Sequence, residues 1–207
     1  MSDFPPGRYS QLLVGHVWPS GSNLAVVNSA SADFGNTAAA YQDLQDQLCQ
    51  ARFGPLADQV GVTGDDVRGA FQRGEDHARA VAEKNEIKRA AFQSAHDAAK
   101  ELRSQLTTIA EEGDEQIRHI QAGKGSSEAK LDKLVDVVLD CQIRANAAAA
   151  SYGQDILNAV QQILAAEGID KSARQLAEDH GIDAGRMFGR PHQDSIREQL
   201  SALLEAT

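Results

Sequence analysis

The fold is decided by one stretch, Val67–Ile120, which reads VRGAFQRGEDHARAVAEKNEIKRAAFQSAHDAAKELRSQLTTIAEEGDEQIRHI and contains no proline. Its apolar residues recur every three or four positions, which predicts one long amphipathic helix. The other positions carry mainly Glu, Lys, Gln and Arg, all good helix formers. A helix of this length cannot bury its apolar stripe alone, so the sequence predicts that partner helices pack along it.

The same pattern returns after the tip Gly123-Lys124-Gly125-Ser126 and continues to about Leu164. Its apolar positions follow steps of three and four, close to a heptad seam: Leu131, Leu134, Val135, Val138, Ala145, Ala149, Tyr152, Ile156, Val160 and Ile163. Two long helices joined by a tight turn predict an antiparallel helical hairpin, onto which the rest of the chain docks.

A third seam precedes the hairpin, in a helix predicted from about Asn23 to Arg52 and ended by Phe53-Gly54-Pro55. Val27, Ala30, Phe34, Thr37, Tyr41, Leu44 and Leu48 form this seam, which favours shallow packing angles between the helices. Ser20 or Ser22 can cap this helix. Leu56–Val60 is predicted as a short helical piece, and Gly61–Gly64 as a break before the long helix, which Asp65 or Asp66 would cap.

The two ends of the chain predict smaller elements. Arg8–Val17 is apolar enough for one short helix, and Trp18, before Pro19, is expected to pack over the bundle as a lid. A short helix is expected from Asp170 to Asp179, a loose segment at Gly185–Pro191 and a last helix over Ser195–Glu205. The predicted fold is all-α: an elongated helical bundle built on the hairpin, with a small helical C-terminal appendage. The predicted domains are 1–166 and 167–207.

One polar residue, Asn85, falls near the seam of the long helix. Two interpretations stay open. Its partner helix can have ended there, leaving Asn85 solvated, or the long helix can pass from one partner helix to another at this level.

Composition restricts the function classes. The net charge of −10 argues against a nucleic-acid backbone or an anionic membrane as the main partner. The sequence contains no run of eighteen apolar residues and no basic-then-apolar leader, so no membrane-spanning helix and no Sec-type signal peptide are expected. The two cysteines, Cys49 and Cys141, fall on helix levels too far apart for a disulfide.

No catalytic or metal-binding pattern stands out. Gly123-Lys124-Gly125-Ser126-Ser127 lacks the spacing and the preceding strand of a phosphate-binding loop, so it is interpreted as a polar hairpin turn. The six histidines form no HExxH pattern, and surface positions are expected for them. The expectation is a protein that is not an enzyme and has no cofactor, no metal site and no catalytic residues.

The order of these features resembles a known family. Four features follow one another: a Trp-containing entry loop (Trp18-Pro19), a helix of about thirty residues, a turn at Val62-Thr63-Gly64 and a longer helical hairpin. In this order they are similar to the N-terminal helical domain of type VII (ESX) secretion substrates of actinobacteria. The likeness is to the WxG/PPE group, including EspB- and EspK-like proteins and the N-terminal domains of ESX-exported toxins, and covers roughly residues 5 to 165. Valine stands where the WxG turn has tryptophan. The YxxxD/E export signal is absent, so either a partner supplies it or the likeness is one of architecture.

The resemblance implies a function without catalysis. The chain would be a secretion substrate, or the targeting domain of a larger effector, that presents helical surfaces to a small WxG/PE-like helical-hairpin partner and a secretion chaperone. It would be cytoplasmic before export, then secreted or held at the cell surface by a Sec-independent route. The alternatives are a pore-forming or membrane-associated helical oligomer after export and a cytosolic helical scaffold; homo-oligomerisation stays open.

The residues expected to bind partners lie at four places: Trp18, the turn Val62, Thr63 and Gly64, the hairpin tip Gly123, Lys124 and Gly125, and the alanine-rich faces that contain Ala39 and Ala148. Small side chains all round a helix allow another helix to approach from more than one side, which favours helix-in-groove binding. The alternative is that alanine is present only as a good helix former on solvated faces.

Overall fold

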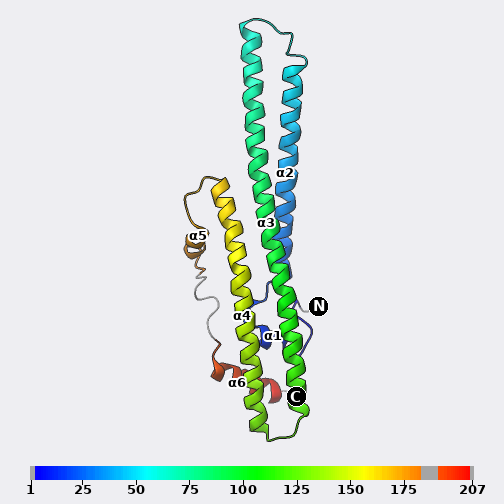
Figure 1. Ribbon diagram of the computed structural model, residues 1–207, viewed down its shortest axis with the longest axis vertical. Coiled ribbons are helices and arrows are strands. Elements are labelled where there is room, and N and C mark those ends of the chain that lie inside the picture. Colours follow the sequence, from blue (N-terminus) through cyan, green and yellow to red (C-terminus); the bar gives the residue numbers. More distant parts are fainter. Residues whose placement is uncertain (1–2, 183–190, 206–207) are drawn as a thin grey trace. The chain divides into compact units, whose positions relative to one another are not determined.

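The computed structural model describes residues 3–182 and 191–205. In chain order the helices are α1 (Ser10–Val14), a 3₁₀ turn η1 (Gly15–Val17), α2 (Gly21–Phe53), α3 (Val62–Ala122), α4 (Ser127–Ala166), α5 (Ala173–Asp179) and α6 (Gln193–Glu205) (Figure 1). No strand occurs in these two ranges. The prediction of an all-α helical bundle built on a long hairpin is confirmed.

The ends of the three long helices lie close to the predicted ones. Ser20 caps α2, since its Oγ accepts a hydrogen bond of 3.2 Å from the backbone N–H of Asn23. Gly125 makes the turn between α3 and α4 with a φ of 148°, a conformation that suits glycine. Ser126 then caps α4 by accepting from the N–H of Ala129 at 3.3 Å. Gly168, with a φ of 70°, follows the end of α4.

The connection between α2 and α3 differs from its prediction in two ways. Leu56–Val60 is not helical and forms turns and irregular chain. The Leu56 carbonyl accepts a turn hydrogen bond of 3.3 Å from the N–H of Gln59 and a second one of 3.0 Å from Arg68. Val62, Thr63 and Gly64 are not a break, because they form the first turn of α3. Gly61, with a φ of 100°, makes the turn before them.

The chain forms two compact units, which cut across the long helices. Unit 1 comprises residues 1–24, 96–157 and 173–207, and unit 2 comprises residues 25–95 and 158–172. The last helix, α6, packs into the core of unit 1, and the predicted domains 1–166 and 167–207 stay a prediction. The predicted loose segment Gly185–Pro191 lies outside the described residues except for Pro191.

Unit 1 has a conventional apolar core. α1 supplies Leu12, Leu13 and Val14, and α6 supplies Ile196 and Leu200. They pack with large side chains of α3 and α4: Leu102, Leu106, Ile109, Ile117, Leu134, Val135 and Val138. The core therefore joins segments from both ends of the chain to the middle of the sequence, and helix burial of this kind is the main stabilising contribution to a bundle.

Unit 2 buries much smaller side chains. Its buried apolar residues are Ala38, Ala78, Ala82, Ala91, Ala159 and Leu164, and its buried polar residues are Ser31, Glu75 and Asn85. Asn85 is not solvated: its side-chain amide donates to the Val81 carbonyl at 2.8 Å. At this level α3 contacts both α2, through Phe34 stacked on Phe92, and the chain just after α4, through an ion pair between Lys88 and Glu167.

Candidate interaction surface

Few side chains of α2 are buried, and few carry a charge. Only Ser31 and Ala38 are buried in its 33 residues. Its predicted seam is half-buried at Val27, Ala30, Phe34, Thr37, Tyr41 and Leu48 and exposed at Leu44. Asp33, Asp43, Asp46 and Arg52 are its only charged side chains. An exposed helix with so little charge resembles the centre of protein interfaces, where charged residues are depleted.

Polar and aromatic contacts tie α2 to α3 where apolar burial is small. Ser31 Oγ donates to the Arg89 carbonyl at 3.0 Å, and the rings of Phe34 and Phe92 stack with centroids 5.4 Å apart. Near the far end of α2, Arg52 donates twice to the Glu75 carboxylate, at 2.5 and 2.9 Å. These hydrogen bonds hold the pKa of Glu75 below its ordinary value and raise that of Arg52.

The turn between α2 and α3 presents large apolar side chains to solvent. Phe53 is 67%, Val60 92% and Val62 80% exposed. The arginines of this turn are engaged within it: Arg52 lies over the Phe53 ring at 4.2 Å, and Arg68 donates to the Leu56 carbonyl and pairs with Asp65. We call Phe53, Val60 and Val62 the apolar tip. Exposed apolar groups gathered in one short turn are a feature of interaction sites.

The hairpin tip between α3 and α4 is different in character. Gly123, Lys124 and Gly125 are exposed, and Lys130 donates across the turn to the Gln121 carbonyl at 2.8 Å. The tip contains no large apolar side chain, so any partner here would have to bind through polar groups.

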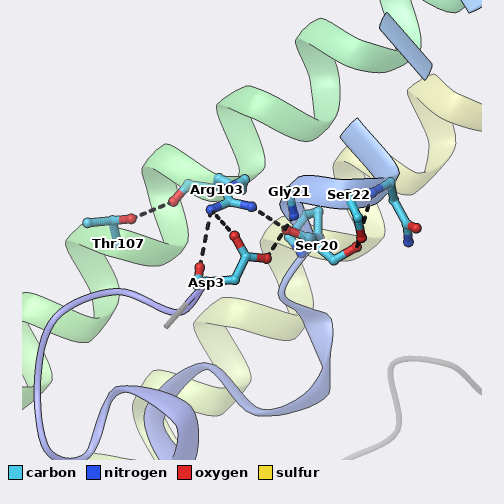
Figure 2. A network of polar contacts seen from close by, with 8 residues as sticks. Asp3, Ser20, Gly21, Ser22, Arg103 and Thr107 are labelled. Atoms are coloured by element: carbon cyan, nitrogen blue, oxygen red, sulfur yellow. Dashed lines mark hydrogen bonds and ion pairs between the residues drawn. The ribbon is translucent and has the colours of Figure 1, made fainter. Parts of the chain in front are cut away.

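Trp18 belongs to the packing of unit 1 rather than to an open surface. It stacks on Phe4 with centroids 5.9 Å apart, and the guanidinium of Arg103 lies 4.4 Å from its ring centroid. Figure 2 shows how Arg103 also binds Asp3 through a hydrogen bond of 2.9 Å, while Asp3 accepts from the N–H of Gly21 at 2.7 Å. Hydrogen bonding by Arg103, then by Gly21, lowers the pKa of Asp3. Trp18 packs against the core as expected, although its partner Arg103 lies within α3 and not at an end of that helix.

The remaining predicted positions do not form one surface. Ala39 is exposed on α2 in unit 2, whereas Ala148 is half-buried on α4 against the core of unit 1. Thr63 is exposed and Gly64 half-buried in the first turn of α3, beside the exposed Val62. Sequence reasoning missed Phe53 and Val60, although their position flanking Gly54-Pro55 and Gly61 was a usable signal, because apolar residues in a turn have little to pack against.

Three further predictions concern a disulfide, a metal site and a membrane-spanning helix. Cys49 and Cys141 are both free thiols, as predicted. Among the described residues, no group of three or more His, Cys, Asp or Glu side chains is arranged to hold a metal ion. In the same residues no helix combines the length and the hydropathy that crossing a membrane requires.

Comparison with known proteins gives a relative among the curated proteins. The chain is 32% identical over 180 residues to the uncharacterized protein Rv2082 of Mycobacterium tuberculosis (strain ATCC 25618 / H37Rv). The match covers 87% of this chain and 24% of that protein, so the chain spans about a quarter of its relative's length. No protein-family model matches the chain. No solved structure matches it either.

Proposed function

We propose that this chain is a non-enzymatic interaction domain of a type VII secretion substrate, or of a larger exported effector, that presents helical surfaces to a small helical-hairpin partner and a secretion chaperone. It acts in the cytoplasm before export and is then released or held at the cell surface. The single observation that carries the proposal is the contrast within unit 2, which buries little beyond alanine and exposes Phe53, Val60 and Val62.

Two further points support this proposal. The resemblance to the WxG/PPE group rests on a helix of about thirty residues followed by a longer helical hairpin, and α2, α3 and α4 follow one another in this order. The relative in Mycobacterium tuberculosis comes from an actinobacterium, the group in which the resemblance lies. Under this proposal the uncharged face of α2, including Ala39, together with the apolar tip, is where the partner helices dock.

The experiment is co-expression with candidate small helical proteins of the WxG/PE type, followed by size-exclusion chromatography and an export assay in a mycobacterial host. The wild-type chain is expected to co-elute with one of them and to reach the medium only when the ESX apparatus is intact. Ala39→Glu and the pair Phe53→Ser/Val62→Ser should each abolish co-elution while the melting temperature stays the same.

A matched control uses the same kind of change on another exposed position. Ala147→Glu, on α4 in unit 1, should leave co-elution intact. Export that is unchanged in a strain lacking the ESX apparatus would contradict the secretion role. Co-elution that survives both unit 2 variants would contradict the docking surface and leave the hairpin tip at Gly123–Gly125 as its replacement.

A further inference from the structure

An exposed stripe of side chains runs along α2 within unit 2. Its members recur every three or four residues, so they lie on one face of the helix. All of them are exposed: Val26, Ser29, Asp33, Asn36, Ala40 and Asp43. We call this set the outer stripe of α2. It is about 25 Å long, and most of its side chains are small, so the backbone of a second helix can approach it closely.

The charges of the outer stripe are all negative and have no counter-ion. Asp33 and Asp43 lie on the stripe, and Asp46 follows one turn later. Within the residues that the structure describes, none of these three carboxylates takes part in an ion pair or a hydrogen bond. The negative charge of the stripe is therefore available to a partner.

The chain's own cations near α2 do not compensate this charge. Lys88 lies over the Phe34 ring at 5.3 Å, and the side chain of Arg89 passes beside Gly35. Both of these cations, and Arg52 of α2, are paired with a carboxylate outside α2. The pairs are Arg52–Glu75, Lys88–Glu167 and Arg89–Glu86. A partner that supplies positive charge along the stripe would therefore meet carboxylates that are not already engaged.

We propose that the helix that docks on the outer stripe is cationic, with a seam of small or apolar side chains flanked by Lys or Arg groups that reach Asp33 and Asp43. These aspartates are ten residues apart, which is about 15 Å along the helix, so the partner's cations are nearly three helical turns apart as well. An acidic helix of the same shape is rejected, because it would bring like charges together. This inference rests on the proposed function, since it names the chemistry of the partner helix that docks on unit 2.

The experiment uses a displayed library of small designed helical hairpins as its probe. One helix of each hairpin has a seam varied among Ala, Ser, Val and Leu, and its flanking positions hold Lys, Gln or Glu in equal proportion. The full chain is the bait, at low ionic strength. We expect the selected hairpins to contain at least about threefold more Lys than Glu at the flanking positions and to bind more slowly as salt is added.

A pair of charge variants tests which carboxylates select the lysines. Asp33→Asn/Asp43→Asn should bind the selected hairpins about fivefold or more weakly than wild type does, mainly through slower association. Glu111→Gln/Asp136→Asn makes the same change in net charge at two exposed positions of unit 1 and should bind them as wild type does. Equal losses in the two variants would overturn the proposal, because the effect would then come from net charge alone.

A neutral variant separates this inference from the proposed function. Ala40→Trp fills the middle of the outer stripe without changing its charge and should remove binding of the selected hairpins. Hairpins that Ala40→Trp blocks but that show no excess of Lys would overturn the cationic partner and leave the docking surface standing. Hairpins that still bind Ala40→Trp, or a selection that enriches no binder, would overturn both, while the export assay tests the secretion role separately. A dimer of the chain alone that Ala40→Trp abolishes would make a second copy the occupant and would also overturn the proposal.

Discussion

Unit 1 and unit 2 both contain long stretches of α3 and α4, yet they bury different kinds of side chain. In unit 1 the core holds Leu, Ile and Val from α3 and α4, completed by α1 and α6. In unit 2 the same two helices and α2 bury five alanines and one leucine, with Arg52–Glu75 and Ser31 as polar ties. Each buried CH₂ group contributes roughly 0.8 kcal/mol, so unit 1 gains far more from its core than unit 2.

The difference shows how a short segment can complete the apolar core of a bundle of long helices. α1 has only five residues, yet Leu13 and Val14 are almost fully buried against α3 and α4. Such a segment supplies the apolar volume that two packed helices leave open. No comparable segment covers the described residues of α2, where Val26 and Leu44 are exposed. We therefore expect unit 1 to determine the stability of the fold and unit 2 to be the part that responds to partners.

The largest expected effect is the removal of a core side chain from unit 1. Leu134 is 2% exposed, so Leu134→Ala should cost about 2–5 kcal/mol of unfolding free energy. Phe92 of unit 2 is only half-buried beside Phe34, so Phe92→Ala should cost less, roughly 1–2 kcal/mol. Urea unfolding followed by circular dichroism measures both. A larger loss at Phe92 would reverse the ranking of the two units.

A second test compares two helical glycines of α3. A Cβ on Gly113 would lie 2.7 Å from a Leu13 methyl and 2.9 Å from Cys141 Sγ, whereas one on Gly69 would meet only Arg73 at 3.5 Å. Gly69→Ala should stabilise the protein by about 0.5–1 kcal/mol through helix propensity. Gly113→Ala should destabilise it by about 1–2 kcal/mol, because overpacking outweighs the same gain. Equal shifts in the melting temperature of the two variants would mean that α1 can move away from the added methyl group at little cost in free energy.

These two tests also show what the sequence could and could not predict. The periodicity of Val67–Ile120 predicted α3 because a 3.6-residue repeat is a local property of the chain. The roles of Leu13 and Gly113 depend on tertiary contacts. The need for glycine at position 113 is visible only once the fold brings Leu13 and Cys141 next to it. The burial of α6 in unit 1 escaped prediction for the same reason.

The exposure of the candidate interaction surface was predicted in part. The exposure of Ala39, Val62 and the tip at Gly123–Gly125 agrees with the faces chosen from the sequence, although their binding of partners stays a prediction. Phe53 and Val60 were missed because the turn was interpreted as a short helix, which would have given Val60 a helical neighbour. Trp18 was included because it lies in the entry loop that carries the resemblance, but its contacts with Phe4 and Arg103 use it within unit 1.

A pH experiment tests whether polar ties stabilise unit 2. The pKa of Glu75 is lowered from an ordinary 4.5 by hydrogen bonds from Arg52. The stabilisation is therefore present above that value and is lost as the pH falls below it. Between about pH 5 and pH 3, the melting temperature of wild type should fall more than that of Glu75→Gln. Glu86→Gln, which removes an exposed pair with Arg89 within α3, is the control and should behave like wild type.

The last and mildest test needs no mutation, because each unit contains one cysteine and the rate at which its thiol is labelled can be measured. Cys141 of unit 1 is 1% exposed, and burial raises the pKa of its thiol to about 11, so it can react only when unit 1 opens. Cys49 of unit 2 is only half-buried. Alkylation followed by peptide mass spectrometry should therefore label Cys49 in the folded protein and spare Cys141.

Sub-denaturing urea should accelerate the labelling of Cys141 steeply and that of Cys49 weakly, since larger openings expose more surface. A bound partner on α2 should slow only Cys49. Equal rates and equal urea slopes at both thiols would mean that the two units open together and that the contrast between their cores has no energetic consequence.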